Sequence, residues 1–524
     1  MSILRMKLKF QSVLIIILAT SLFFRLYRNQ FLQFWSDDEA LHAAVVQRML
    51  ITKRPALVSP QPTLGTSIGA GFHLLSAPLF LISKSNPTSI LTIFSLVGLI
   101  TAYLIFLLGK AVKNRSTGLT AAFLYSASFF ASLYDRRWWP ITLTPLLATL
   151  TLLLAIRMFK SGKTHYLPYL IAITASALHG DPAMIMIGLF TIVSLISFRI
   201  VPAKIHLTIS AAIVLIAVSP LLIFEIRHPG TIISPLLQTI SRQKSIGVNR
   251  LETVNHSAKI ILDTVTLLFF PAVTQNAETF LYPQQTHFNA LTLITIPLVF
   301  FLIFFPLVRT SPVKKSPISI SLKVIYIYIA TFIIGSLTFS LVYRHPMQRV
   351  YLTLLFPAIF VLAGSTLTIL NKLNRFIILE FLLLFLSINS FALDISRFRF
   401  PLSIRQQAVN SAIGQIGNNN FSLYAVGNPY LESGGFSRLF SLAGRPPTKS
   451  YDDAWLGWDF RTHGLYTTTP SLEDQKFIVV ISSSSGPTLF PKNILSEKIF
   501  DSLKLTILDN STNWFNPDQL RHAP

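Results

Sequence analysis

The chain has 524 residues, of which 52% are hydrophobic and only 12% are charged, and its mean hydropathy is +0.57. This composition excludes an ordinary soluble protein and is typical of a polytopic membrane protein. The formal net charge of +23 does not indicate a nucleic-acid partner, because basic residues at the ends of apolar segments mark the cytoplasmic side of a membrane. The absence of cysteine excludes disulfides and thiol chemistry.

Apolar stretches long enough to cross a ~30 Å hydrocarbon core as helices recur along the chain. We expect about eleven spans, near residues 11–29, 88–110, 117–134, 141–159, 165–179, 183–199, 206–224, 290–308, 318–342, 350–369 and 376–393. Residues 70–83 are apolar but short, which favours a re-entrant or interfacial helix over a full span.

The basic residues predict the orientation of these spans. The N-terminus and alternate short loops carry Lys and Arg without Asp or Glu, for example Lys110, Lys113, Arg157, Lys160 and Lys163. Cytoplasmic loops are enriched in basic residues, so we expect a multi-pass protein of the cytoplasmic membrane with its N-terminus inside. The odd number of spans then places the C-terminus outside. All but one of the 21 acidic residues fall in predicted outer segments, Glu380 being the exception.

The predicted outer segments divide the chain into two parts. Residues 1–394 form a transmembrane module with a first outer loop at 30–87, a short one at 135–140 and a large later one at 225–289. Residues 395–524 are less hydrophobic and combine helical and strand-like stretches, with buried strands expected at 421–426 and 476–482. We therefore predict a polytopic α-helical membrane protein with a small extracytoplasmic α/β domain at its C-terminus.

An acidic cluster follows the first predicted span directly. Ser36 and Glu39 have the spacing of a capping box, and acidic residues in a first turn suit the helix dipole. Capping does not require both Asp37 and Asp38, and carboxylates kept at a bilayer surface usually hold a substrate or move a proton. We therefore predict that at least one of these two residues belongs to a functional site.

A second candidate group lies at the outer end of the third span. Asp135, Arg136 and Arg137 precede two tryptophans and a proline. Asp135 is either a second acid of the site or neutralises one of the two arginines, and the tryptophans are possible interfacial anchors. An arginine here suits a phosphate group, because guanidinium binds phosphate oxygens in bidentate fashion.

The remaining polar candidates lie at the outer ends of later spans. His179 stands at a Gly-Asp-Pro break and either lines a cavity or only belongs to the turn. Glu225 and Arg227 end the seventh span, where they either pair with one another or contact a substrate. A basic and aromatic group precedes the tenth span and is either a phosphate site or an interface belt: Arg344, His345, Arg349 and Tyr351. No cluster of His, Asp and Glu has metal-ligand spacing.

These motifs and their order resemble the GT-C glycosyltransferases of family 39, which include protein O-mannosyltransferases and aminoarabinose transferases. In that family a basic N-terminus and one span lead to an outer Asp-Glu-Ala motif, here Asp38-Glu39-Ala40. The resemblance covers roughly residues 1–395 and implies a GT-C-like bundle with Asp38 as general base, Asp37 and Glu39 beside it, and Asp135 as a second acid. Asp135 departs from the family pattern, because in many members the acid follows the arginine.

The resemblance implies an inverting enzyme that moves a sugar from a polyprenyl-phosphate carrier to an acceptor hydroxyl outside the membrane, without a metal or other cofactor. Its partners would be that donor, a glycan, lipid or protein acceptor, and membrane lipids. The expected phosphate-binding residues are Arg136, Arg137, Arg227, Arg344, His345 and Arg349, and the expected cavity residues are His179, Glu225 and Tyr351. The first loop lacks the Glu-Lys-Pro-Pro run of aminoarabinose transferases, which argues against their substrate.

Two other functions remain open from the sequence. A glycan polymerase or ligase would use a diphosphate-linked donor in the same setting. A transporter or lipid flippase would place ionisable residues near mid-membrane and often show repeated halves. The clustering of charges at one face and the lack of an evident repeat disfavour transport.

Overall fold

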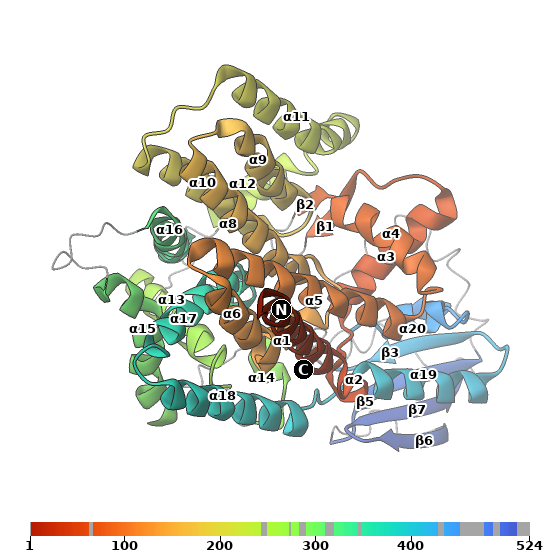
Figure 1. The fold of residues 1–524 in the computed structure, drawn as a ribbon. Helices are drawn as coiled ribbons and strands as arrows, with labels where there is room; N and C mark the ends of the chain where they lie inside the picture. The colour runs from red at the N-terminus through yellow and green to blue at the C-terminus, as the bar shows by residue number, and fades with distance from the viewer. Residues whose placement is uncertain are drawn as a thin grey trace.

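The computed structural model describes residues 2–61, 66–242, 249–271, 274–281, 290–309, 319–343, 347–427, 434–450, 476–485 and 493–510. A helical bundle forms most of the molecule, and a five-stranded sheet from the C-terminal residues lies at one side of it (Figure 1). The segment 30–87 lies on the same side of the bundle as this sheet and shares a hydrophobic cluster with it.

Every predicted span coincides with helical structure. The first seven correspond to α1 (Ser2–Leu26), α5 (Pro87–Val112), α6 (Arg115–Ala127) with α7 (Phe129–Asp135), α8 (Thr144–Ser161), α9 (Leu167–Ala175), α10 (Ile185–Ser197) and α11 (Lys204–Arg227). The last four correspond to α15 (Ala290–Arg309), α16 (Ile320–Tyr343), α17 (Phe356–Leu370) and α18 (Arg375–Ile395). Short 3-10 helices extend several of these: η2 (Pro140–Leu143), η3 (Thr164–Tyr166), η4 (Ser176–His179), η5 (Pro182–Met184) and η7 (Arg349–Leu355).

Length and composition separate these helices into two groups. Within the described residues, six helical stretches are long and apolar enough to cross a membrane: Pro87–Val112, Pro140–Ser161, Lys204–Arg227, Ile320–Val342, Arg349–Leu370 and Arg375–Ile395. Four apolar helices are shorter: Phe10–Leu26, Gly71–Ile82, Pro182–Ser197 and Ile294–Val308. The number of eleven spans therefore stays a prediction.

The third predicted span is interrupted. Residues 117–134 were expected as one helix, but the chain breaks at Ser128, which has extended backbone angles and begins α7. The Ser128 hydroxyl accepts a hydrogen bond from Ala131 N (3.4 Å) and donates one to Leu268 O (2.8 Å). A side chain that satisfies the free backbone groups makes such a break stable inside a bundle.

Helix α17 lies at the centre of the bundle, with 94% of its apolar window buried. It packs most closely on α6, where a Cβ on Gly364 would lie 2.9 Å from Ala121 N. Small residues allow such close approach of two backbones, which is how helices gain packing energy where lipid is as apolar as the side chains.

The first outer loop is compact and structured. It contains α2 (Asn29–Leu32), α3 (Asp37–Thr52), β1 (Val58–Gln61) antiparallel to β2 (Thr66–Gly69), and α4 (Gly71–Ile82). Helix α4 is the short apolar helix expected at 70–83. It buries Phe72 and Phe80 and exposes Leu74, Leu75 and Ile82, as a helix at a membrane interface does.

The segment 225–289, predicted as a large outer loop between two spans, is largely helical where it is described. It contains α12 (Ile233–Arg242), α13 (Arg250–Leu267) and α14 (Glu278–Leu281). Helix α13 packs on α16 and α15, and the Ser257 and Ser340 hydroxyls are hydrogen-bonded at 2.8 Å. Because polar residues alternate with apolar ones along α13, its sequence contains no continuous apolar run that would have predicted a helix there.

The C-terminal residues form α19 (Leu402–Ile416), β3 (Phe421–Ala425), α20 (Phe436–Leu442), β4 (Lys449–Ser450), β5 (Phe477–Ser483), β6 (Ile494–Phe500) and β7 (Leu503–Asp509). The strand order is β4-β3-β5-β7-β6, with β3 parallel to β4 and β5 and the other pairs antiparallel. Strands β3 and β5 are the two buried strands expected from the sequence.

The two ends of α5 contact different parts of the chain. At its start, the Thr88 hydroxyl donates to Gln406 in α19 (3.1 Å). At its end, Ala111 O accepts from Lys160 Nζ (2.8 Å), so two predicted inner segments meet there. One hydrophobic cluster unites the first outer loop, Trp138 and the C-terminal sheet. Segments predicted to lie outside the membrane thus gather at one end of the bundle.

Candidate active site

The site begins at the first turn of α3. Ser36 is its N-cap and completes a capping box: Ser36 Oγ accepts from Asp38 N (3.3 Å), and Ser36 N donates to Glu39 Oε2 (2.9 Å). The side chain of Asp38 is 34% exposed, whereas Asp37 and Glu39 are buried. Asp38 is therefore the acid of this cluster that is most open to a substrate.

Arg137 reaches α3 from the second outer loop. Its Nε and Nη2 donate to the two Glu39 oxygens at 2.6 and 2.9 Å, and its Nη2 lies 3.5 Å from Asp38 Oδ2. The guanidinium also lies 4.0 Å from the centre of the Trp139 ring. A buried bidentate pair fixes both partners, so Glu39 is engaged in holding Arg137, and Arg137 is held beside Asp38.

Asp135 lies elsewhere, in a buried ion pair that the sequence did not predict. Arg25 of α1 donates from Nε to Asp135 Oδ2 (2.8 Å), and the Tyr125 hydroxyl donates to the same oxygen (3.1 Å). Asp135 and Arg25 are fully buried. Asp135 therefore neutralises neither Arg136 nor Arg137 in an ion pair. It ties α7 to α1.

Two of the expected phosphate-binding arginines are also held by protein groups. Arg136 is buried and donates to Asn29 Oδ1 (2.8 Å) and to the carbonyl oxygens of Phe24 and Tyr27. Arg349 is buried, pairs with Asp263 of α13 and donates to the carbonyl oxygens of Thr279 and Phe280. These contacts tie Arg136 to the segment after α1 and Arg349 to α13 and α14, and leave both guanidinium groups buried.

Tyr351 is half-buried and lies within electrostatic range of both Asp38 and Asp181. Asp181 follows η4 and caps η5, its Oδ1 accepting from Ala183 N (2.9 Å). Its Oδ2 is buried and has no hydrogen-bond partner among the described residues. Burial raises the pKa of the Asp181 carboxyl to about 6, and the bond from Ala183 N opposes this in part. Three elements thus place two acids and a tyrosine around one region.

His179 joins η4 to the start of α4 and to α11. Its Nδ1 accepts from Gly71 N (3.3 Å), and its Nε2 donates to Ala217 O of α11 (2.7 Å). It lines an apolar cavity of about 500 Å³ together with Phe72 and Ile216. The sequence left open whether His179 lines a cavity or only belongs to the turn. In the structure it belongs to the turn and also lines this apolar cavity.

The other residues expected at the site do not join this cluster within the part of the chain that the structure describes. Glu225 caps the turn after α11, accepting from Gly230 N (2.7 Å) and Ile232 N (2.8 Å), and no ion pair with Arg227 is recorded within the described residues. Arg227 is exposed. Arg344 and His345 lie outside the described residues.

A pair of buried histidines links α3 to α4. His42 Nδ1 and His73 Nε2 are 2.9 Å apart, linking α3 to α4 among the rings of Phe72 and Trp138. Burial lowers the pKa of His73 to about 3. Burial, followed by His73 and Arg137, lowers the pKa of His42 well below its ordinary value. The pair is therefore neutral at physiological pH and contributes to the packing of the two helices.

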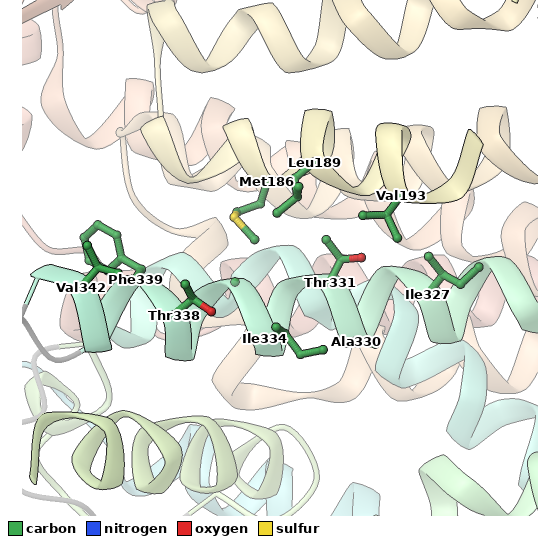
Figure 2. A pocket seen from close by; sticks show the side chains of 11 residues that line it. Met186, Leu189, Val193, Ile327, Ala330, Thr331, Ile334, Thr338, Phe339 and Val342 are labelled. Atoms are coloured by element: carbon green, nitrogen blue, oxygen red, sulfur yellow. The ribbon is translucent and has the colours of Figure 1, made fainter. Parts of the chain in front are cut away.

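An apolar groove runs between α10 and α16, with a volume of about 480 Å³ (Figure 2). Met186, Leu189 and Val193 line it from α10, facing Ile327, Thr331 and Phe339 among the α16 residues. One end reaches Met186 and Val342, which are near in sequence to Asp181 and to the end of α16. This end of the groove lies at the start of α10, which follows Asp181 and η5 directly in the chain.

Sequence reasoning missed Arg25, Asp263 and the His73 partner of His42. Arg25 had a signal, because an arginine inside an apolar span requires a buried acidic partner. The sequence did not say which acid that is, since Arg25 and Asp135 are 110 positions apart.

Comparisons with known proteins agree with this architecture. The model of the dolichyl-phosphate-mannose-protein mannosyltransferase family matches residues 71–224. The structure of ArnT from Cupriavidus metallidurans in the apo state is 11% identical, with a TM-score of 0.57 and coverage of 99% of this chain and 100% of that chain. Its structure bound to undecaprenyl phosphate is 11% identical, with a TM-score of 0.56 and coverage of 95% and 97%.

The oligosaccharyltransferase of Archaeoglobus fulgidus in the apo form is 13% identical, with a TM-score of 0.50 and coverage of 90% of this chain and 69% of that chain. A search of curated protein sequences found no significant match. The fold is that of the GT-C membrane glycosyltransferases, which confirms the resemblance found in the sequence. The family match, combined with this fold, indicates a glycosyltransferase of the mannosyltransferase-like type.

Proposed function

We propose that the chain transfers a sugar from a polyprenyl-phosphate carrier to an acceptor hydroxyl on the extracytoplasmic face, with inversion at the anomeric carbon. The observation that carries this proposal is the setting of Asp38: a partly exposed carboxylate in a capped first turn, 3.5 Å from a fixed guanidinium. A positioned carboxylate contributes ~10²–10⁴-fold as a general base.

In the proposed reaction Asp38 takes the proton of the acceptor hydroxyl as its oxygen attacks the anomeric carbon. The bond from that carbon to the phosphate oxygen breaks, and the polyprenyl phosphate leaves with the bonding electrons. Asp37 is the alternative base, but it is buried. Arg137, fixed by Glu39, orients Asp38 and supplies positive potential near the developing charges.

The groove between α10 and α16 supports a lipid-linked donor. Its lining is almost entirely apolar, with two threonines, Thr331 and Thr338 (Figure 2). A chain of isoprene units gains roughly 25 cal/mol for each Å² of apolar surface that it buries. The similar fold of ArnT in complex with undecaprenyl phosphate agrees with a donor of this class.

The donor phosphate needs cationic groups near the leaving oxygen. Arg136, Arg137 and Arg349 are buried against protein acceptors. We therefore keep Arg227, which is exposed, as a candidate for the phosphate, together with Arg344 and His345, which lie outside the described residues. A metal-free reaction is part of the proposal.

The test measures sugar transfer in proteoliposomes with a panel of labelled polyprenyl-monophosphate sugars, host-membrane extract as a source of acceptors, and chelator present. Wild type should release polyprenyl phosphate, and Asp38→Asn should be slower by ~10²–10⁴-fold. Turnover with diphosphate-linked donors alone would replace the proposal with a polymerase or ligase. Movement of the lipid without product would replace it with a transporter.

A further inference from the structure

The C-terminal part of the chain contacts the residue that caps the helix of Asp38. Gly435, at the start of α20, is buried with φ at +82°. Its carbonyl oxygen accepts a hydrogen bond from the indole nitrogen of Trp35 at 3.2 Å. A Cβ on Gly435 would lie 2.7 Å from Trp35 Nε1 and 2.8 Å from Ser36 O. Only glycine fits both this backbone conformation and this close approach.

A second contact reaches the same segment from α19. Arg405 is buried and donates from Nη1 to Gly434 O (2.7 Å). Its guanidinium lies 5.8 Å from the centre of the Phe34 ring, and that of Arg137 lies 5.1 Å from the same ring. Phe34 is therefore in contact with both arginines, one from the C-terminal part and one from the site.

We propose that the Gly434–Gly435 turn positions the general base, so that the C-terminal part of the chain completes the active site of the bundle. This inference rests on the proposed function. Ser36 O accepts from Ala40 N (3.0 Å), so a displacement of Ser36 shifts the first turn of α3 and moves Asp38 relative to Arg137. Misplacement of a reacting group by about 1 Å can cost ~100-fold in rate.

The chain contains a matched control at the other end of α20. Gly444 has φ at +79°, is exposed, and would place a Cβ in open space with no atom within 4 Å. Alanine at Gly435 or at Gly444 introduces the same kind of backbone strain. The two substitutions differ in the contact with Trp35 and Ser36, so a difference between them reports on that contact.

The experiment compares wild type, Gly435→Ala and Gly444→Ala as full-length protein in proteoliposomes. We expect Gly435→Ala to lower kcat by about 10–100-fold, with the donor KM within about twofold of wild type, because the base is displaced while the lipid groove is intact. Gly444→Ala should keep both constants within about twofold. The amount of undecaprenyl phosphate that each preparation binds at saturation gives the fraction of folded protein, by which kcat is corrected.

A second variant covers the case in which Gly435→Ala does not fold. Trp35→Phe keeps an aromatic ring but removes the donor to Gly435 O, and we expect kcat to fall by about 3–10-fold at unchanged donor KM. Equal kcat values for Gly435→Ala and Gly444→Ala would overturn the positioning role. So would a decrease in the kcat of Gly435→Ala that disappears when the rate is divided by the fraction of folded protein. A wild-type kcat and KM for Trp35→Phe also overturn it. No transfer by wild type overturns the proposed function itself, and this inference with it.

Discussion

Glu39 and Arg137 form a bidentate ion pair that is shielded from solvent and lies next to Asp38, with donor–acceptor distances of 2.6 and 2.9 Å. Glu39 also closes the capping box of α3. One carboxylate therefore fixes both the first turn of the helix and the guanidinium beside the proposed base. Glu39 is thereby engaged with protein groups, and of the three acids in the cluster only Asp38 is substantially exposed.

We expect Arg137→Lys to lower transfer by about 10–100-fold and to lower the thermal unfolding midpoint. Lysine cannot make the bidentate contact, and it leaves part of the Glu39 charge unpaired in a buried place. Enzyme assays and thermal unfolding in detergent measure the two effects. Arg54→Lys, at an exposed position beyond α3, is the control. Wild-type activity in Arg137→Lys would show that the pair does not position the site.

The choice between the adjacent acids is open to a direct test. We expect Asp38→Asn to lower transfer by ~10²–10⁴-fold, as loss of a general base does, and Asp37→Asn to keep most of the activity. Asp37 is buried, so its substitution should act mainly on stability. Single-turnover transfer assays compare the two variants at equal folded protein. The reverse order of effects would assign the base to Asp37.

We expect the Arg25–Asp135 pair to contribute to the stability of the folded chain only while both charges are present. Removing one partner of a buried pair typically costs about 3–5 kcal/mol, because the other charge is left uncompensated. We expect Arg25→Met to be strongly destabilised and the double variant Arg25→Met/Asp135→Asn to be more stable than Arg25→Met. Unfolding in denaturant measures the coupling. Additive losses would mean that the two residues do not interact.

The His42–His73 pair predicts a pH dependence of stability. The pKa of His73 is about 3 in the folded chain, against 6.5 for an ordinary histidine. Between these pH values the unfolded chain binds more protons, so stability falls as pH falls from about 6.5 toward 3, by up to about 1.4 kcal/mol per pH unit.

The measurement is thermal unfolding of wild type and His73→Asn between roughly pH 7.5 and 5. This range includes the pKa of roughly 6.5 that a histidine has in the unfolded chain. We expect the midpoint of wild type to fall more steeply on acidification than that of His73→Asn. His165→Asn, at an exposed position, should follow wild type. Parallel curves for wild type and His73→Asn would contradict a neutral buried histidine at this position.

The sequence predicted the helical segments well because hydropathy and length are local properties. It also predicted the capping box of α3 and the buried strands β3 and β5, each from a short pattern. It did not predict α13, whose apolar face is interrupted by polar residues. Nor did it predict the break at Ser128, which depends on Leu268 of a distant segment.

The sequence by itself determined the membrane class, the position of the apolar helices and the acidic turn that opens α3, since all three depend on neighbouring residues. The tertiary structure decided the role of each charged side chain. Asp135, expected as a second acid, pairs with Arg25, and Arg349, expected at a phosphate, pairs with Asp263. These partners are 110 and 86 positions apart, and a buried charge accepts whichever opposite charge the packing of the helices brings within reach.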